Sequence, residues 1–393
     1  MGAQCNAGDV EALLVGRGPT AYTRPLWHTP ATIAGRRVGG RGAGALGSAV
    51  DGGGGRMAAA RGQQAAASGA TPRHARALAL LVVLCLLGAL APWARAARYD
   101  HHFRVIDSRS GLAQNSINAL LQDSRGFVWI ATEGGLHRYD GYSLRQFLHE
   151  PDDPRTLPET FITALTEDDA GRLWIGTNTR YLASLDLASG AIDRHLTARS
   201  EGGKGHRDRV TALLHQPGVG LWVGTGQGVE LFDPATGLRE RRLSFEGDTE
   251  GNLRADGLAL LSDGSLLAAT HEGLFQFAPG ATLPRRIGTA RRLHSVIAEG
   301  ADAAWVGAED GLYRWSRSAS ELQRAWPLQG TSEPVRSIAR DPAGHLWLAL
   351  LHGGLVRYSP ADGGVLRLRN NPDLDRGLHE DRLARVMIDR SGL

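Results

Sequence analysis

From residue 99 onward, short apolar runs alternate with polar turn residues, and the same order of runs returns several times. In the clearest copy, Ile117–Gln122 is an apolar run bounded by polar residues, which is typical of a buried strand. Residues 123–126 predict a turn, because Asp can bond its own backbone and Gly accepts a positive φ. Residues 127–132 are rich in aromatic and β-branched side chains, which favours a second strand. Residues 136–140 and 142–148 complete a set of four predicted strands.

The second predicted strand carries a tryptophan in every copy but one, where Leu267 takes its place. Successive anchors lie 45, 48, 45, 38 and 42 residues apart. A four-stranded unit repeated every ~40–50 residues is the blade of a β-propeller, whereas a helical repeat needs a 3.6-residue apolar spacing that these segments lack. We therefore predict an all-β propeller. Its tryptophan anchors are Trp129, Trp174, Trp222, Trp305 and Trp347.

A seventh copy opens at residue 383, and the next anchor would fall two residues beyond the last residue present. We expect six blades and the start of a seventh, so that residues 97–393 form an incomplete seven-bladed propeller and the chain is a fragment of a longer protein. Residues 99–105 resemble the outermost strand of a blade. N-terminal strands often complete the last blade of a propeller because this pairing hides two exposed edges. With its partners missing, this strand is expected to be loose.

The first 96 residues differ in composition from the repeats. Residues 1–76 are mainly Ala, Gly and Arg, too poor in apolar side chains to offset the entropy of ordering, and are predicted to be disordered. Residues 77–91 are continuously apolar, with basic residues before them and Ala94 and Ala96 after them. This pattern predicts a secretory signal over residues 77–96, cleaved after Ala96, with an uncleaved anchor as the alternative. Such signals lie near the initiator, which favours a true start at Met57.

Charge and cysteine usage agree with export. Residues 1–96 hold ten arginines and three acidic residues, a formal charge of +7; since the whole chain carries +3, the repeats carry −4. Nucleic-acid binding needs a clustered basic face, so no nucleic-acid partner is expected. Both cysteines, Cys5 and Cys85, precede the repeats, which excludes disulfide and thiol chemistry from them. No cofactor, metal site or catalytic residue is predicted, because the isolated histidine pairs lack the spacing of a zinc motif.

Residues 111–117, Gly-Leu-Ala-Gln-Asn-Ser-Ile, and residues 122–141, with Trp129 at their centre, resemble the two-component regulator propeller repeat. The resemblance extends over residues 99–393, and Leu267 departs from it. It implies a periplasmic ectodomain of a bacterial inner-membrane receptor, with a downstream transmembrane helix and a histidine kinase or diguanylate cyclase output. It also implies a homodimer in the full-length receptor. None of the output machinery is in this sequence, so this fragment is not expected to be an enzyme.

The recurring tryptophans are interpreted as core wedges between blades and not as carbohydrate-stacking platforms, because each occupies a fixed place in a strand. Ligands of such rings usually bind where the loops converge on one face around the central channel. The loop positions there are polar and differ from copy to copy, as expected of a one-sided site on a repeated scaffold. The candidate ligand-binding residues are Asn115, Glu133, Asn178, Asp208, Gln227, Asp256, His271, Glu309 and His352.

Three functions remain open at this point. The first is a sensor ectodomain that binds a periplasmic ligand, such as an oligosaccharide, and signals across the membrane. The second is a secreted propeller enzyme of the glycosidase or lyase kind, which would need an acid/base pair or metal cluster at the channel mouth. The third is a protein-interaction scaffold. The sequence does not identify the ligand, the output domain or a second propeller.

Overall fold

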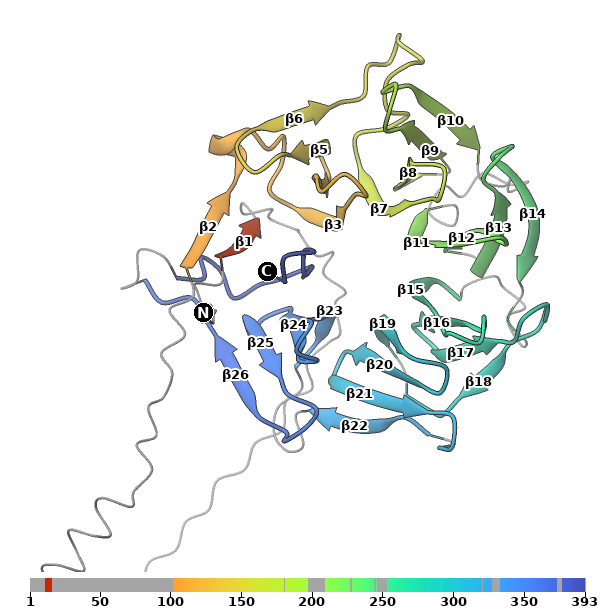
Figure 1. Cartoon of the computed structure of the whole chain (residues 1–393), viewed down its shortest axis with the longest axis vertical. Helices are drawn as coiled ribbons and strands as arrows, with labels where there is room; N and C mark the ends of the chain where they lie inside the picture. Colours follow the sequence, from red (N-terminus) through yellow and green to blue (C-terminus); the bar gives the residue numbers. More distant parts are fainter. Residues whose placement is uncertain are drawn as a thin grey trace, which may run out of the picture. The chain divides into compact units, whose positions relative to one another are not determined.

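The computed structural model describes residues 11–15, 102–179, 181–196, 209–226, 228–243, 245, 253–290, 292–319, 321–326, 333–372 and 377–392. Within these residues, six four-stranded sheets form the blades of a ring, and within each blade every strand pairs antiparallel with its sequence neighbour (Figure 1). The predicted all-β propeller is therefore confirmed. Its blades belong to a compact unit made of Met1–Pro19 and Tyr99–Leu393; the other unit, Thr20–Arg98, lies outside the described residues.

Each blade uses four consecutive strands, beginning with the innermost. Blade 1 comprises β3 (Ile117–Gln122), β4 (Val128–Thr132), β5 (Gly135–Tyr139) and β6 (Leu144–Phe147). Blade 2 comprises β7 (Ile162–Glu167), β8 (Arg172–Thr177), β9 (Tyr181–Asp186) and β10 (Ile192–Leu196). Blade 3 comprises β11 (Val210–Gln216), β12 (Gly220–Thr225), β13 (Gly228–Asp233) and β14 (Leu238–Leu243). Blade 4 comprises β15 (Ala255–Leu260), β16 (Leu266–Thr270), β17 (Gly273–Phe277) and β18 (Arg285–Ile287). Blade 5 comprises β19 (Leu293–Glu299), β20 (Ala303–Ala308), β21 (Gly311–Ser316) and β22 (Gln323–Trp326). Blade 6 comprises β23 (Val335–Arg340), β24 (Leu346–Leu350), β25 (Leu355–Tyr358) and β26 (Val365–Leu368).

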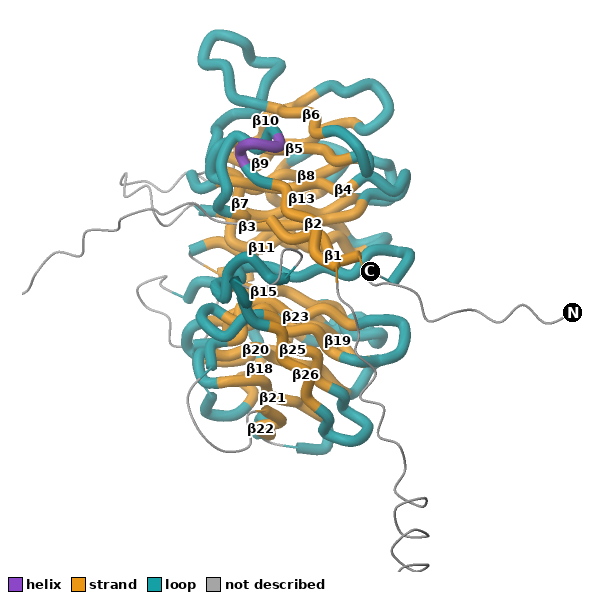
Figure 2. Tube along the Cα trace, turned by 90° about the vertical axis from the view of Figure 1, so that its left-hand side faces the viewer, coloured by secondary structure: helices purple, strands orange, loops and turns teal. Residues whose placement is uncertain are grey.

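Burial follows the position of a strand within its blade. All residues of the second strands β12, β16, β20 and β24 are buried, whereas the outermost strand β14 is mostly exposed and β6 has no buried residue. A strand buried on both faces must be apolar throughout, which explains why the second strand gave the most regular sequence signal. Seen from the side, the strands lie in the middle of the propeller unit and loops emerge on both faces (Figure 2).

The five tryptophan anchors are buried, each in a different apolar cluster; four lie between two blades, and Trp347 lies between blade 6 and the segments of Phe103 and Leu383. Trp129 packs with Ile162 and Ile175 of blade 2, and Trp305 packs with Ile338 and Leu348 of blade 6. Leu267 is also fully buried, in a cluster shared by blades 4 and 5. The anchors therefore hold adjacent blades together by burying apolar surface, which stabilises the ring by roughly 25 cal/mol per Å².

The seventh repeat packs into the ring without forming a strand. Residues 382–389 contain no assigned strand, contrary to the strand-like reading of their sequence. Leu383 nevertheless lies in a cluster with Phe103 and Trp347, and its amide donates to the Leu350 carbonyl at 2.9 Å. The segment thus lies between blades 6 and 1, where Figure 1 places the C-terminus.

The N-terminal strand is not loose, which corrects the sequence-based expectation. It forms β2 (His102–Ile106), which pairs parallel with β1 (Glu11–Val15). Phe103 and Ile106 are buried, against blade 6 and blade 1 respectively. The predicted disorder of residues 1–76 stays a prediction, because Glu11–Val15 is the one part of that range among the described residues. The rest of that leader, Met57, the signal over residues 77–96 and Ala96 lie outside the described residues.

Within the part of the chain that the structure describes, no helix has the length and apolar character needed to span a bilayer.

Candidate functional site

A β-bulge recurs at the start of the innermost strand of all six blades. In blade 1, Ile117 pairs with Thr132 and Ala119 with Ala131, so Asn118 between them faces no residue of its own in the adjacent strand β4. The same one-residue shift occurs in the other five innermost strands. A bulge of this kind leaves one residue unpaired and re-aims its side chain. The bulged residues are Asn118, Thr163, Thr211, Asp256, His294 and Arg336.

All six bulged residues line one cavity of about 210 Å³, and Arg385 of the seventh repeat lines it too. Because the innermost strands surround the centre of the ring, the cavity lies in the central channel (Figure 1). Every bulged side chain is polar, and no two neighbouring blades except 2 and 3 contribute the same residue type. The repeated backbone therefore presents a different polar group from nearly every blade to one space.

Two of the bulged residues bond the backbone of the adjacent blade through their side chains. The Asn118 side-chain amide donates to the Ile162 carbonyl of blade 2 at 2.8 Å. The Thr211 hydroxyl donates to the Ala255 carbonyl of blade 4 at 2.5 Å. These bonds fix the inner strands against each other, so the channel wall is held by the same side chains that line it.

His294 is held between two charged groups. Its Nε2 lies 2.8 Å from Glu309 Oε2, and its Nδ1 lies 3.3 Å from Arg336 Nη1. An arginine can only donate, so Nδ1 accepts and the proton of the neutral ring lies on Nε2. Burial is the main cause that lowers the pKa of His294, and the charge of Arg336 adds to it against the opposing effect of Glu309. His294 is therefore neutral at pH 7.

Arg385 brings a second guanidinium to the channel. Its Nε donates to the Asn118 carbonyl at 2.6 Å and its Nη1 to its own neighbour's carbonyl, Ala384 O, at 3.2 Å. Burial, followed by repulsion from Arg336, lowers the pKa of Arg385 to about 10, so it remains charged at pH 7. Asp256 is the acidic residue of the lining, and its Oδ1 already accepts from Arg254 Nε at 2.5 Å.

Two hydroxyls of the lining have no hydrogen-bond partner in the described part of the chain: Thr163 Oγ1 and Ser295 Oγ. Both oxygen atoms are buried, and a buried hydroxyl without a partner costs about 1–3 kcal/mol. At the wall of the channel, these two hydroxyls are available to bond a ligand or water.

The structure places one of the nine predicted rim residues, Asp256, in the cavity wall and a second, Glu309, on His294. Asn115 and Glu133 are half-buried and bond within the loops, to the Ser108 amide and the Gln114 side chain. The remaining residues lie elsewhere or cannot be placed: Asn178 is half-buried beside Phe161, His271 and His352 are exposed, and Asp208 and Gln227 lie outside the described residues.

The sequence analysis selected loop residues, whereas the cavity is lined by residues of the innermost strands and by Arg385. The overlooked residues are Asn118, Thr163, Thr211, His294, Arg336 and Arg385. A signal for the bulged positions was present: the second residue of each innermost strand is polar in all six blades and follows an apolar residue. In a strand buried on both faces, a polar residue at a fixed position indicates that its side chain leaves the core.

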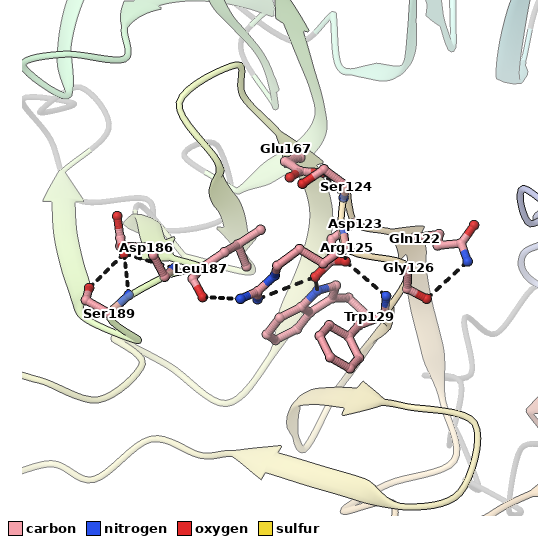
Figure 3. A network of polar contacts seen from close by, with 12 residues as sticks. Gln122, Asp123, Ser124, Arg125, Gly126, Trp129, Glu167, Asp186, Leu187 and Ser189 are labelled. Atoms are coloured by element: carbon pink, nitrogen blue, oxygen red, sulfur yellow. Dashed lines mark hydrogen bonds and ion pairs between the residues drawn. The ribbon is translucent and has the colours of Figure 1, made fainter.

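The turn between the first two strands carries a structural pair of polar residues. In blade 1, Asp123 is fully buried and accepts from the Trp129 indole at 2.8 Å and from the Phe127 amide at 2.9 Å. Figure 3 shows Arg125 extending from this turn to the Leu187 carbonyl of blade 2. The Asp-Trp pair therefore orders the hairpin and the contact between blades, and it has no place in the channel.

The same pair varies from blade to blade. Asp168 and Asp341 bond Trp174 and Trp347, and Gln216 replaces the aspartate beside Trp222. Blade 4 has Leu261 and Leu267 at the two positions, so both partners are apolar. In blade 5, Glu299 forms ion pairs with Arg314 and Arg340, and the buried Trp305 indole N–H has no hydrogen-bond acceptor within the described residues.

Groups of three or more His, Cys, Asp or Glu side chains that could hold a metal ion are absent from the described residues.

Comparison with known proteins agrees with this architecture. Residues 111–134 and 156–179 match the family described as two component regulator propeller. No curated protein matches the chain. Among solved structures, the extracellular domains assigned to the hybrid two component systems BT3049 and BT4673 of B. thetaiotaomicron are similar, with TM-scores of 0.62 and 0.59 and identities of 19% and 18%.

These similarities extend over 74% and 70% of this chain but only 39% and 36% of the two extracellular domains, so the chain spans little more than a third of their length. The WD40 β-propeller domain of Doa1 is also similar, with a TM-score of 0.50, 13% identity, and coverage of 70% of this chain and 91% of that domain. At these identities the likeness shows the fold.

Proposed function

We propose that this chain, which carries two component regulator propeller repeats, is part of an exported receptor ectodomain and that its central channel binds the signalling ligand. The observation that carries this proposal is the ring of bulged residues, one from each blade, which brings six polar side chains of five types to one cavity. A purely structural bulge would need no such variety. Small-molecule sites usually combine a concave pocket with a few well-placed polar groups.

Two further observations support a sensing role. The family matched by residues 111–134 and 156–179 is named for two component regulators. The similar solved structures from B. thetaiotaomicron are extracellular domains of systems of that kind. A signalling ectodomain needs a ligand site whose occupancy changes contacts between parts of the protein, since a ligand shifts an equilibrium only by its differential affinity for two states. Asn118, Thr211 and Arg385 meet this need, because each both lines the cavity and bonds an adjacent blade or segment.

The test is a thermal-shift screen of the full 393-residue chain against glycans and small metabolites. A ligand of the folded state raises stability by about 2.7 kcal/mol when its concentration is 100 times its Kd. We expect a saturable rise in Tm for a small set of related compounds. A chain whose Tm no compound changes would contradict the ligand-binding part of the proposal.

The matched variants are Asp256→Asn and Asp302→Asn. Both aspartates are paired with an arginine, but Asp256 lines the channel and Asp302 is exposed in the turn between β19 and β20. We expect Asp256→Asn to change the affinity or the selectivity for the compound found in the screen and Asp302→Asn to leave both unchanged. Equal behaviour of the two variants would place the binding site outside the channel.

A further inference from the structure

The charges around the channel are unbalanced. Its lining contains two arginines, Arg336 and Arg385, and one acidic residue, Asp256, while His294 is neutral. Asp256 is engaged by a third arginine, Arg254, at 2.5 Å. The walls of the channel therefore carry an excess of positive charge that the lining carboxylate does not neutralise.

Arg385 differs from the arginines of the outer surface in its partners. Its hydrogen bonds go to the backbone carbonyls of Asn118 and Ala384, and neither partner carries a charge. Arginines on the outside of the blades pair with carboxylates: Arg314 with Glu299 at 3.0 Å, and Arg324 with Asp310 at 2.9 Å. Holding a half-buried arginine beside a second arginine without a carboxylate partner is costly. The lowered pKa of Arg385 has the same cause, burial and the nearby charge of Arg336.

The geometry points to an anion site: we propose that the channel binds a small organic acid through its carboxylate, with Arg385 and Arg336 as the cationic contacts. This inference rests on the proposed function and names the class of its ligand. A planar guanidinium matches a carboxylate with two parallel hydrogen bonds. The bulged residues of the other blades then bind the polar groups on the rest of the ligand.

The lining also limits the size of the anion. It contains two arginines and one aspartate, and that aspartate is already paired with Arg254, so the wall stays cationic. The cavity of about 210 Å³ is smaller than the ~300–1,000 Å³ of drug-sized pockets, so the ligand is a compact molecule or one residue of a longer chain. Asp256, Thr211 and Asn118 offer acceptors and donors for hydroxyl groups. A sugar acid has both the carboxylate and the hydroxyls.

The direct test is isothermal titration calorimetry of the full 393-residue chain with D-galacturonate and with D-galactose at pH 7.5. The two sugars differ in whether carbon 6 is a carboxylate. We expect D-galacturonate to bind at least about tenfold more tightly than D-galactose, since a charge-assisted hydrogen bond is about twice as strong as a neutral one. The affinity is expected to fall as salt is added, because the attraction is between charges. Equal affinity for the two sugars, or no binding of D-galacturonate, overturns the inference.

Variants connect the binding to the two arginines. Arg385→Gln and Arg336→Gln should each weaken binding of D-galacturonate at least about tenfold, and Arg385→Lys should restore part of it by keeping the charge. Arg155→Gln is the matched control, because Arg155 pairs with Asp153 on an exposed loop and its side chain is 86% exposed. Unchanged binding in both Arg385→Gln and Arg336→Gln overturns the inference; the Tm of each variant without ligand shows that it is folded.

A third set of titrations separates this inference from the proposed function. Inorganic phosphate bound more tightly than D-galacturonate would overturn the carboxylate assignment and replace it with a phosphate site. A neutral glycan that raises the Tm in the thermal-shift screen, while D-galacturonate does not bind, would leave the sensor proposal standing and overturn the anion site. Failure of every compound in both experiments would contradict the sensor proposal itself.

Discussion

Asp168 and Asp169 are adjacent in the sequence but play different parts in the structure. Asp168 is buried and accepts hydrogen bonds from the Trp174 indole, the Arg172 side chain and the amides of Ala170 and Arg172, at 2.8 to 3.0 Å. The Asp169 side chain is 69% exposed and faces His215 at 3.7 Å. Only the first carboxylate has partners that would be left buried and unsatisfied by its removal.

We therefore expect Asp168→Ala to lower the free energy of unfolding by about 2–3 kcal/mol, since it leaves a buried indole and a partly buried arginine without their acceptor. Asp169→Ala should change it by less than about 0.5 kcal/mol, as surface substitutions usually do. Urea unfolding followed by tryptophan fluorescence measures both. Similar losses in the two variants would show that the Asp-Trp pair does not hold the hairpin.

The pKa of His294 predicts a pH dependence. Burial and Arg336 lower this pKa below its ordinary value of 6.5, against the opposing effects of Glu309 and Asp256. The folded state therefore binds the proton less well than the unfolded state, so the contribution of His294 to stability is present above pH 6.5 and is lost as the pH falls below it.

The measurement is the free energy of unfolding of the wild type minus that of His294→Gln, followed from pH 7.5 to pH 5. Subtracting the variant cancels the other titrating groups to first order. We expect the difference to decline as the pH falls. A difference that grows toward pH 5 would mean that Glu309 outweighs burial and that His294 is protonated in the folded state.

At the scale of the element, the second strand of each blade carries a small residue two positions after the anchor. These residues are Ala131, Gly176, Gly224, Ala269, Gly307 and Ala349. A methyl group added at Gly176 would meet the Val210 side chain, with its Cβ at 2.9 Å, and one added at Gly307 would meet the Val335 carbonyl at 2.7 Å. Val210 and Val335 begin the next blades, so this position sets how closely two blades approach.

Gly176→Ala should therefore cost about 1–3 kcal/mol of folding free energy, because overpacking at this site has to separate blades 2 and 3. Ala188→Val adds two methyl groups on an exposed turn of the same blade and should be nearly neutral. Thermal denaturation of the two variants provides the comparison. A stable Gly176→Ala variant would show that the contact between blades 2 and 3 can relax at no cost.

The sequence predicted the strands of each blade well, because strand, turn and anchor depend on local patterning. Trp129 and the turn at residues 123–126 could be identified from their own segment. The site could not be identified in this way, because a bulge depends on pairing with the next strand. In the sequence of its own segment, Asn118 is indistinguishable from an ordinary strand residue. Its bulge is evident only from the register, in which Ile117 and Ala119 pair with Thr132 and Ala131. The position of Arg385 at the channel could not be predicted either, since Arg385 bonds Asn118, which lies 267 positions earlier in the sequence.

At the scale of the whole molecule, the segment that follows blade 6 joins the two ends of the ring. Ser337 of blade 6 bonds the backbone of Val386 at 3.3 Å, and Arg390 bonds Gln122 and Ser124 of blade 1 at 2.8 and 2.9 Å. Leu383 is 8% exposed in the cluster with Phe103 and Trp347. The channel is thus bounded by seven segments, although only six of them are blades.

Leu383→Ala should lower the free energy of unfolding by about 2–5 kcal/mol, because truncating a buried leucine removes apolar contacts and leaves a cavity. It should also speed hydrogen exchange in β3 and β23, the strands that the segment contacts, before it affects β11 and β15 on other blades. Arg382→Ala, at an exposed neighbouring position, is the control and should change neither. Uniform acceleration in all innermost strands would contradict a local closure of the ring.

The central claim is that ligand binds in the channel lined by the bulged residues. The most direct measurement is hydrogen exchange by mass spectrometry on the full chain, with and without a saturating compound from the thermal-shift screen. The account predicts protection in peptides of the innermost strands β3, β7, β11, β15, β19 and β23 and of residues 383–390. Protection confined to the outermost strands, or to the exposed loops at His271 and His352, would contradict it.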